Sequence, residues 1–457
     1  MTAADISAAL VALTIVIGSA HAIGQVMERL RQPRLIGEIL AGVLLGPFVF
    51  GRVAPAVTRT VFGGDAADDT TRIVIEFVSW LGLLLLMFLS GSEARRVLAR
   101  ENRRATAWLF GLGTPLPFVA ALIVGSWISL DGLAGPSGSR ASVLLILAAA
   151  ATVMSIPVIS RIFHDLGILG TRFASLVLSV AIAEDIVLWA VLAIATALAA
   201  SGAGAAGGIA THVAATVAYL FAGVAVAPAL VKRLHDARWN SLATASPVRY
   251  AVLLLLVYGS LASLMNVNLV FAAFLAGFGL VGGREGASRE RFAVPLEAIT
   301  SVSTAVFVPV YFVVVGSQLQ LGHQFAPVML AVFLIGSTIV RAASVAGAAK
   351  LAGFAPLDRI NLAVTCNARG GPGIVLASIA FEAGIINGRF FTTLVLTAIL
   401  TSQFAGAWLA WVLRRGRPLL SDDHAGPERH EASASPLSGQ GRGPQRTAVE
   451  RRRRRQR

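Results

Sequence analysis

Residues Thr171–Ala200 read TRFASLVLSVAIAEDIVLWAVLAIATALAA. This apolar run is long enough to cross a bilayer as a helix, yet it carries Glu184 and Asp185 side by side. At about 1.5 Å per residue, Asp185 lies about 21 Å from the start of the run, near the centre of a hydrocarbon core about 30 Å thick. Ionisable residues at that depth are costly and usually functional, so the pair marks a candidate site within a transmembrane helix.

The composition extends this interpretation to the whole chain. Of the 457 residues, 56% are hydrophobic and 14% are charged, and the mean hydropathy is +0.75. A soluble protein of this length needs far more charged surface. We therefore predict an all-α polytopic membrane protein, and its single cysteine, Cys366, excludes an intramolecular disulfide.

Apolar runs of sufficient length predict about thirteen transmembrane helices. They lie near residues 5–27, 35–51, 71–91, 105–130, 142–163, 171–200, 208–231, 247–263, 266–282, 293–318, 325–352, 359–383 and 389–413. Arginines cluster in alternate loops between these runs, beginning with Arg29, Arg31 and Arg34 after the first run. The positive-inside rule then places the N-terminus outside and the C-terminus in the cytoplasm.

The sequence divides into two parts of different character. We predict that residues 1–416 form the transmembrane domain. Residues 417–457 are polar, rich in Ser, Pro and Gly, and end in RRRRRQR, which is typical of a disordered Arg-rich cytoplasmic tail. Such a tail attracts the anionic headgroups of the lipid bilayer, and a role in binding nucleic acid is not expected.

Short sequence matches recur in the same order in two halves of the transmembrane part. Leu40–Gly42 matches Leu275–Gly277, and Gly91–Ser92 matches Gly316–Ser317. The repeats so defined cover about residues 35–200 and 266–413. Because an odd number of predicted spans separates their starts, the two five-helix repeats run oppositely across the membrane, which is a transporter architecture.

One predicted helix in each repeat contains helix-breaking residues at its middle. The polar and helix-breaking residues are Thr152, Ser155 and Pro157 in the first repeat and Asn367, Gly370, Gly371 and Pro372 in the second. Non-helical backbone at that depth is tolerated only where protein or water satisfies it. Paired breaks in corresponding positions therefore predict two crossing broken helices at a binding site, and the alternative is a pair of ordinary proline kinks.

The acidic pair needs partners within the membrane. Adjacent helical residues point about 100° apart, so Glu184 and Asp185 face different surroundings. Burial favours the protonated carboxyl, whereas a nearby arginine or a bound cation favours the carboxylate, so such a site can bind either a proton or a cation. Arg341 and Arg369 are the predicted charge partners, the first for Glu184 and the second for the exposed carbonyls of the break or the ion path. Alternatively, the arginines only neutralise two structural acids.

The second repeat lacks an equivalent acidic pair. At the corresponding position the chain reads Thr401-Ser402-Gln403. We therefore expect one charged site per chain.

Several segments, together spanning nearly everything before the tail, resemble the monovalent cation:proton antiporters of the CPA2 family. They are QPRLIGEILAG at 32–42, LMFLSG at 86–91, AFLAG at 273–277 and FVPVYF at 307–312. The resemblance implies that Asp185 is the ion and proton carrier and that the protein is a homodimer. In electrogenic members of the family the acidic pair is usually Asp-Asp, and its first acid commonly pairs with a lysine. This chain has Glu184 as the first acid and Arg341 at the position of the lysine. Because arginine stays protonated, proton coupling would rest on the carboxylates alone.

We therefore predict a secondary antiporter, not an enzyme, that exchanges Na⁺ or K⁺ for protons by alternating access in a bacterial inner membrane. Asp185, Glu184 and Thr152 are the predicted ion- and proton-binding residues, since hard cations prefer oxygen ligands. No cofactor is expected. The alternatives are a sodium-coupled organic-anion symporter and a gated cation channel. An intramembrane protease would need its catalytic acids on separate helices.

Overall fold

The computed structural model describes residues 2–30, 32–63, 70–97, 103–200, 214–219, 221–236, 240, 245–265, 267–281, 293–322 and 325–421. The predicted tail from residue 422 onward and part of the predicted span 208–231 lie outside these residues. Within the described ranges the regular structure is helical, apart from one isolated β-bridge between Ala134 and Ile386.

The helices follow the predicted apolar runs. The first half of the chain forms α1 (Ala3–Arg29), α2 (Arg34–Leu45), α3 (Phe50–Val53), α4 (Pro55–Phe62), α5 (Thr70–Val97), α6 (Arg103–Gly113), α7 (Pro115–Trp127), α8 (Arg140–Thr152), α9 (Ile156–Asp165) and α10 (Arg172–Ala200). The second half forms the π-helical turn η1 (Ala222–Val226), α12 (Ala227–Asp236), α14 (Pro247–Leu264), α15 (Leu269–Leu280), α17 (Ala293–Val302), the π-helical turn η2 (Ser303–Phe307), α18 (Val308–Ser317), α19 (Pro327–Leu351), α20 (Pro356–Thr365), α21 (Gly370–Glu382) and α22 (Gly388–Arg414).

Nine helical segments within the described residues are long and apolar enough to cross a membrane. Two further predicted spans, 142–163 and 359–383, are each divided into two short helices, α8–α9 and α20–α21. Helix α15 is a shorter apolar helix. The fold is thus that of an all-helical membrane protein with nine candidate spans, and the expected total of about thirteen crossings stays a prediction.

Side-chain caps fix where several helices begin. The first N–H groups of a helix have no partner within the helix, and a Ser or Asn before it can accept from them. Ser139 accepts from the N–H of Ser142 at 3.2 Å, and Asn387 accepts from the N–H of Phe390 at 3.0 Å. Ser155 accepts from the N–H of Val158 at 3.3 Å, so α9 has the cap of a separate helix.

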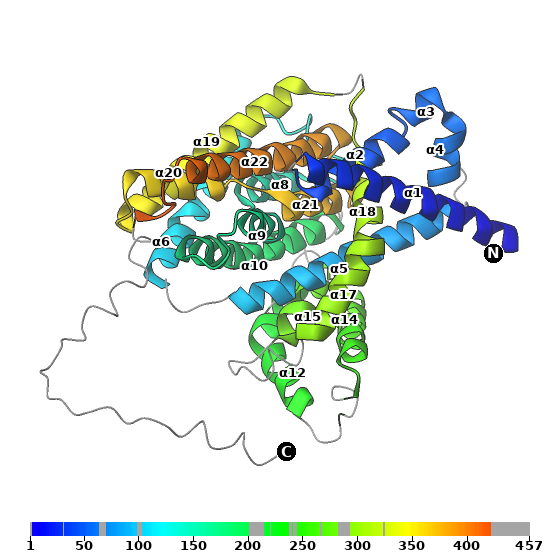
Figure 1. Cartoon of the computed structure of the whole chain (residues 1–457), viewed down its shortest axis with the longest axis horizontal. Coiled ribbons are helices and arrows are strands. Elements are labelled where there is room, and N and C mark those ends of the chain that lie inside the picture. Colours follow the sequence, from blue (N-terminus) through cyan, green and yellow to red (C-terminus); the bar gives the residue numbers. More distant parts are fainter. Residues whose placement is uncertain are drawn as a thin grey trace, which may run out of the picture.

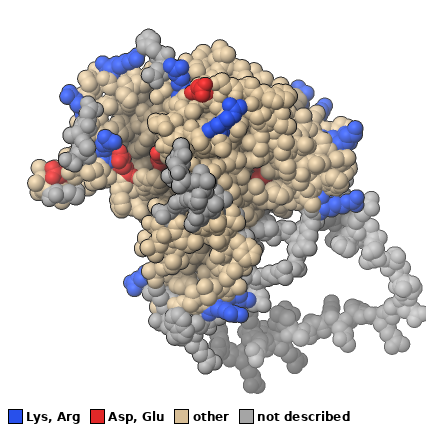
Figure 2. Space-filling model, turned by 180° about the vertical axis from the view of Figure 1, so that it is seen from behind, with Lys and Arg blue, Asp and Glu red and all other residues tan. Residues whose placement is uncertain are grey.

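The helices pack into two bundles. Helices α6–α10 pack with α19–α22 into what we call the site bundle, and α1–α5 pack with α14, α15, α17 and α18 into the scaffold bundle. In Figure 1 the site bundle lies on the left, α1–α4 extend to the right, and α12, α14, α15 and α17 lie below. Figure 2 shows a face on which charged side chains are sparse and lie mostly near the margins, as expected of a surface that meets lipid.

Two close helix contacts in the scaffold bundle depend on glycine. A side chain at Gly42 of α2 or at Gly316 of α18 would collide with the backbone of the other helix. The same holds for Gly91 of α5 and Gly277 of α15. These are the four glycines of the sequence matches in the two halves. Small residues of this kind allow helices to approach closely in a membrane, where contacts depend on backbone packing.

The residues after α22 fold back onto α20. Leu419 and Leu420 are buried, and the side-chain amide of Asn361 donates to the carbonyl of Leu419 at 3.0 Å. The buried carboxylate of Asp358 accepts from the N–H of Ser421 at 3.1 Å and from its hydroxyl at 3.0 Å. Leu419–Ser421, near the start of the segment assigned to the tail, are therefore packed against the membrane domain, and the tail from residue 422 onward lies outside the described residues.

Candidate functional site

The two interrupted helices meet at their breaks. Helix α8 ends at Thr152 and α9 begins at Ile156, while α20 ends at Thr365 and α21 begins at Gly370. The N–H of Ser155 in the first break donates to the carbonyl of Ala368 in the second at 2.8 Å. Non-helical residues separate the helix ends at both sites, so the predicted interruptions are present and the alternative of ordinary proline kinks does not describe them.

The contact between the breaks requires a glycine. Gly370 has φ +37°, a conformation that side chains with a Cβ rarely adopt. A Cβ there would also lie 2.6 Å from the hydroxyl oxygen of Ser155. Gly371 and Pro372 follow in the first turn of α21, and Pro157 lies in the first turn of α9.

Helix α22 supplies hydrogen-bond acceptors for backbone N–H groups of the second break. The N–H of Gly370 donates to the hydroxyl of Ser402 at 3.0 Å, and the N–H of Arg369 donates to the hydroxyl of Thr401 at 3.4 Å. Both hydroxyls occupy the position that corresponds, in the predicted repeat relation, to the acidic pair of α10. Polar side chains of α22 thus meet the start of α21 directly.

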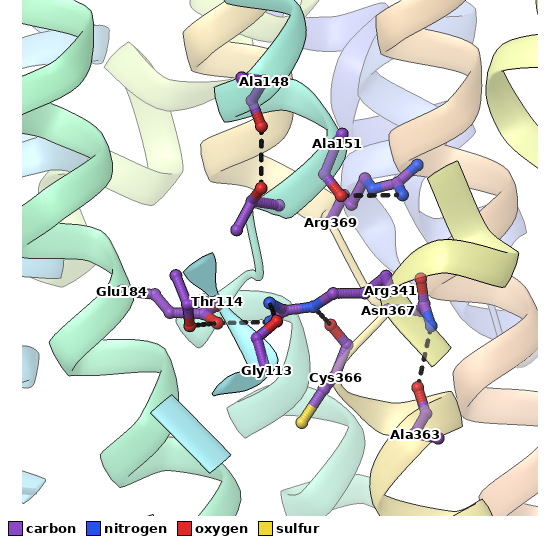
Figure 3. Close-up of polar contacts among 11 residues, drawn as sticks. Gly113, Thr114, Ala148, Ala151, Glu184, Arg341, Ala363, Cys366, Asn367 and Arg369 are labelled. Atoms are coloured by element: carbon purple, nitrogen blue, oxygen red, sulfur yellow. Dashed lines mark hydrogen bonds and ion pairs between the residues drawn. The ribbon is translucent and has the colours of Figure 1, made fainter. Parts of the chain in front are cut away.

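Glu184 is held in a buried network (Figure 3). It is 0% exposed, and its Oε1 accepts from Nη2 of Arg341 at 2.5 Å and from the hydroxyl of Thr114. Arg341 also donates from Nη1 to the carbonyl of Gly113 at 2.7 Å and from Nε to the carbonyl of Cys366 at 3.3 Å. The expected partnership between Arg341 and Glu184 is therefore formed, with additional groups around it.

Asp185 has different surroundings. It is 1% exposed, and neither of its carboxylate oxygens has a hydrogen-bond partner among the described residues. Its helix, α10, packs against α8, α9 and α21, the elements that carry the breaks. Buried in this way, the carboxyl group of Asp185 is stable either as a carboxylate with a bound cation or as the protonated acid without one.

The remaining predicted residues surround the breaks. Arg369 donates from Nη2 to the carbonyl of Ala151 at 3.4 Å, and its guanidinium lies 5.8 Å from the ring centre of Phe333. Ala151 lies in the last turn of α8, where unpaired carbonyls carry partial negative charge, so Arg369 offsets that charge.

Thr152 and Asn367 offer oxygen atoms near the crossing. The Thr152 hydroxyl donates to the carbonyl of Ala148 at 2.8 Å, which leaves its lone pairs available to a ligand. The side-chain nitrogen of Asn367 donates to the carbonyl of Ala363 at 2.9 Å, while its oxygen has no partner in the described structure. Both groups suit a hard cation.

Two cavities approach the second break from the end of α1. One, of about 690 Å³, is lined by Glu28, Arg161, Gln403 and Arg414, and it reaches Ser402, which holds the start of α21. A smaller cavity of about 170 Å³ lies between the two bundles and touches Gly371 and Pro372. The larger cavity thus brings polar side chains to Ser402, and the smaller one reaches the start of α21.

Sequence reasoning missed the contribution of the junction between α6 and α7. Thr114 and the carbonyl of Gly113 both contact the Glu184–Arg341 pair. The available clue was the Pro115 and Pro117 pair, because prolines within an apolar span leave backbone carbonyls without helical donors.

Comparisons with known proteins agree with this architecture. The family described as sodium/hydrogen exchanger, transmembrane, matches residues 12–415. Cation/H(+) antiporter 17 of Arabidopsis thaliana is 26% identical over 427 residues, which cover 90% of this chain and 49% of that protein. K(+)/H(+) antiporter 1 of Saccharomyces cerevisiae is 26% identical over 398 residues, covering 82% of this chain and 42% of that protein. This chain thus spans about half the length of these relatives.

A shorter relative matches over nearly its full length. The Na(+)/H(+) antiporter NhaS4 of Synechocystis is 25% identical over 398 residues, covering 85% of this chain and 93% of that protein. Among solved structures, the sodium proton antiporter MjNhaP1 from Methanocaldococcus jannaschii matches with a TM-score of 0.61 at 15% identity, covering 89% of this chain and 98% of that one. At that identity the likeness establishes the fold alone.

The family match covers most of the residues that form the two bundles, including those of the candidate site. It confirms the resemblance to cation:proton antiporters, makes the chain a multi-pass membrane protein, and excludes the intramembrane protease, since the family is one of transporters. The chain belongs to the sodium/hydrogen exchanger family.

Proposed function

We propose that this protein is a secondary antiporter that exchanges a monovalent cation, Na⁺ or K⁺, for protons across a bacterial inner membrane. One observation carries the proposal furthest: Asp185 is buried and both its oxygens lack a partner in the described structure, while its neighbour Glu184 is paired with Arg341. A buried carboxylate with no protein partner must hold a proton or a cation. Competition between the two at one group is the basis of antiport.

The charge balance of the site favours exchange of one cation for one proton. Glu184 and Arg341 neutralise each other, and arginine does not release its proton at physiological pH. Only Asp185 is then free to change its occupant. Both loaded forms of Asp185 are neutral, so the moving bundle carries no net charge from this group in either direction.

The two-bundle arrangement supports alternating access. We propose that the site bundle moves against the scaffold bundle and carries Asp185 with Thr152 and the crossing breaks. The glycine contacts α2–α18 and α5–α15 relate the halves of the scaffold in the way that two inverted five-helix repeats require, and they support repeats at about residues 35–200 and 266–413. We further propose about thirteen crossings, an outside N-terminus, a transmembrane domain of residues 1–416, a cytoplasmic Arg-rich tail and a homodimer.

The repeat relation also supports a position for Asp185 next to the first break. In the second repeat, Thr401 and Ser402 of α22 accept from the N–H groups at the start of α21. The corresponding position on α10 is that of the acidic pair. We therefore propose that Asp185 faces the first break, where a cation would also meet backbone and hydroxyl oxygens.

The relatives transport different ions by name, sodium in the Synechocystis protein and potassium in the Saccharomyces protein. A direct test uses everted vesicles with a dye that reports the pH gradient, pulsed separately with Na⁺, Li⁺ and K⁺. We expect at least one cation to dissipate the gradient, Asp185→Asn to abolish the response, and Asp131→Asn, in an exposed loop, to leave it intact. An unchanged response in Asp185→Asn contradicts the mechanism, and no response to any of the three cations contradicts the function and favours the symporter.

A further inference from the structure

The junction between α6 and α7 creates an acceptor for Arg341. In a helix, each N–H donates to the carbonyl four residues earlier. Pro117 has no N–H, so the carbonyl of Gly113 has no helical donor. Nη1 of Arg341 donates to that carbonyl at 2.7 Å. Pro117, in the first turn of α7, thereby leaves free one of the groups that hold the arginine.

The same junction holds the partner of the arginine. Thr114, which is buried, donates its hydroxyl proton to Oε1 of Glu184. That oxygen also accepts from Nη2 of Arg341. Figure 3 shows the three side chains converging between α10, α19 and the junction. One short segment, Gly113–Pro117, thus contacts both members of the buried ion pair.

We propose that Thr114 is a positioning residue that keeps Glu184 ionised and fixed against Arg341, so that exchange takes place at Asp185 alone. The proposal rests on the antiport function and concerns the different roles of Glu184 and Asp185 in it. A hydrogen bond from a hydroxyl stabilises a carboxylate and not its protonated form. The fixed negative charge of Glu184 in turn increases the affinity of Asp185 for both of its competing cations.

The surroundings of Glu184 limit which groups can take over this role. Among the described residues, the charged and titratable groups that interact with it are Asp185 on the same helix, Arg341 on α19 and Cys366 in the second break. Arg341 already donates hydrogen bonds to three different acceptors, and Cys366 is a buried free thiol. Among these described groups there is no second hydroxyl that could replace that of Thr114.

The test compares Thr114→Val with Thr114→Ser in reconstituted vesicles. Valine keeps the branched shape and removes the hydroxyl, and serine keeps the hydroxyl. Loss of a buried hydrogen bond to a charged group predicts an apparent KM for the cation about tenfold higher in Thr114→Val. The half-maximal pH of exchange also moves to lower pH, because Asp185 loses affinity for the proton as well. Thr114→Ser retains the wild-type KM and pH profile.

A matched control is Thr393→Val. Thr393 on α22 is also buried, and its hydroxyl donates only to the carbonyl of Arg389 on its own helix, at 3.0 Å. We expect this variant to keep the KM and pH profile of the wild type. A change in Thr114→Val that Thr393→Val reproduces, or an unchanged KM and pH profile in Thr114→Val, overturns the proposal.

Two further comparisons distinguish poor folding of the variant, failure of the proposed function and failure of this inference. If Thr114→Val accumulates poorly in the membrane, the Thr114→Val/Glu184→Gln variant is compared with Glu184→Gln alone. Equal accumulation of these two variants supports coupling between Thr114 and Glu184, and lower accumulation of the double variant contradicts it. If the wild type exchanges no cation at all, the proposed function fails. If the wild type exchanges cations and Thr114→Val does so with the same KM and pH dependence, this inference alone fails.

Discussion

Arg341 places each of three guanidinium nitrogens on a different acceptor: Glu184 and the carbonyls of Gly113 and Cys366. A planar guanidinium has five donors in a fixed geometry, whereas an ammonium is a compact point charge on a flexible stem. Arginine at this position therefore binds α10, the α6–α7 junction and the second break together. A lysine would preserve the charge without reproducing these three contacts.

Removal of either member of this buried pair should cost stability. Arg341→Ala leaves Glu184 buried without its countercharge, and we expect a loss of about 3–5 kcal/mol in the free energy of unfolding. Thermal or denaturant unfolding of the purified protein in detergent measures this loss. The Arg341→Ala/Glu184→Gln variant removes the uncompensated charge and should recover part of the stability. A double variant no more stable than Arg341→Ala would contradict the ion-pair explanation.

At the scale of helices, backbone contact determines which glycines tolerate substitution. Gly316→Ala places a methyl group against the carbonyl of Ile39, so we expect a loss of about 1–3 kcal/mol from overpacking. Gly336→Ala in α19 is the matched control, because a Cβ there meets nothing within 4 Å. Alanine favours a helix by about 1 kcal/mol over glycine, so the control should be neutral or stabilising. Equal unfolding temperatures for the two variants would contradict the proposed close packing of α2 and α18.

The sequence predicts these elements to different extents, for physical reasons. The length of apolar runs indicates the spans, and Pro157 and the glycines before Pro372 indicate where two helices are interrupted. Glu184 and Arg341 can be paired from sequence because few charges occur within the spans. Thr114 cannot be identified in this way, because one hydroxyl within an apolar run has no periodicity and its partner lies 70 residues away. The packing of Leu419–Ser421 on α20 likewise depends on tertiary contacts.

At the scale of the whole molecule, the exchange should not respond to membrane voltage. Moving one net charge through 100 mV is worth about 2.3 kcal/mol, so an electrogenic cycle would respond strongly. In vesicles loaded for Na⁺/H⁺ exchange, an imposed potential of either sign should leave the initial rate unchanged. Vesicles without an imposed potential are the control. A rate that follows the potential would show that a second group besides Asp185 changes its charge during transport.

The segment that folds back onto α20 gives the two ends of the described chain different attachments. The N-terminal helix α1 belongs to the scaffold bundle, whereas Leu419, Leu420 and Ser421 pack on a helix of the site bundle. A fluorophore at the start of α1 and another at Ser421 would therefore lie on opposite sides of the boundary across which we propose that the bundles move. Energy transfer between them would follow the rocking of one bundle against the other, without any label near the ion.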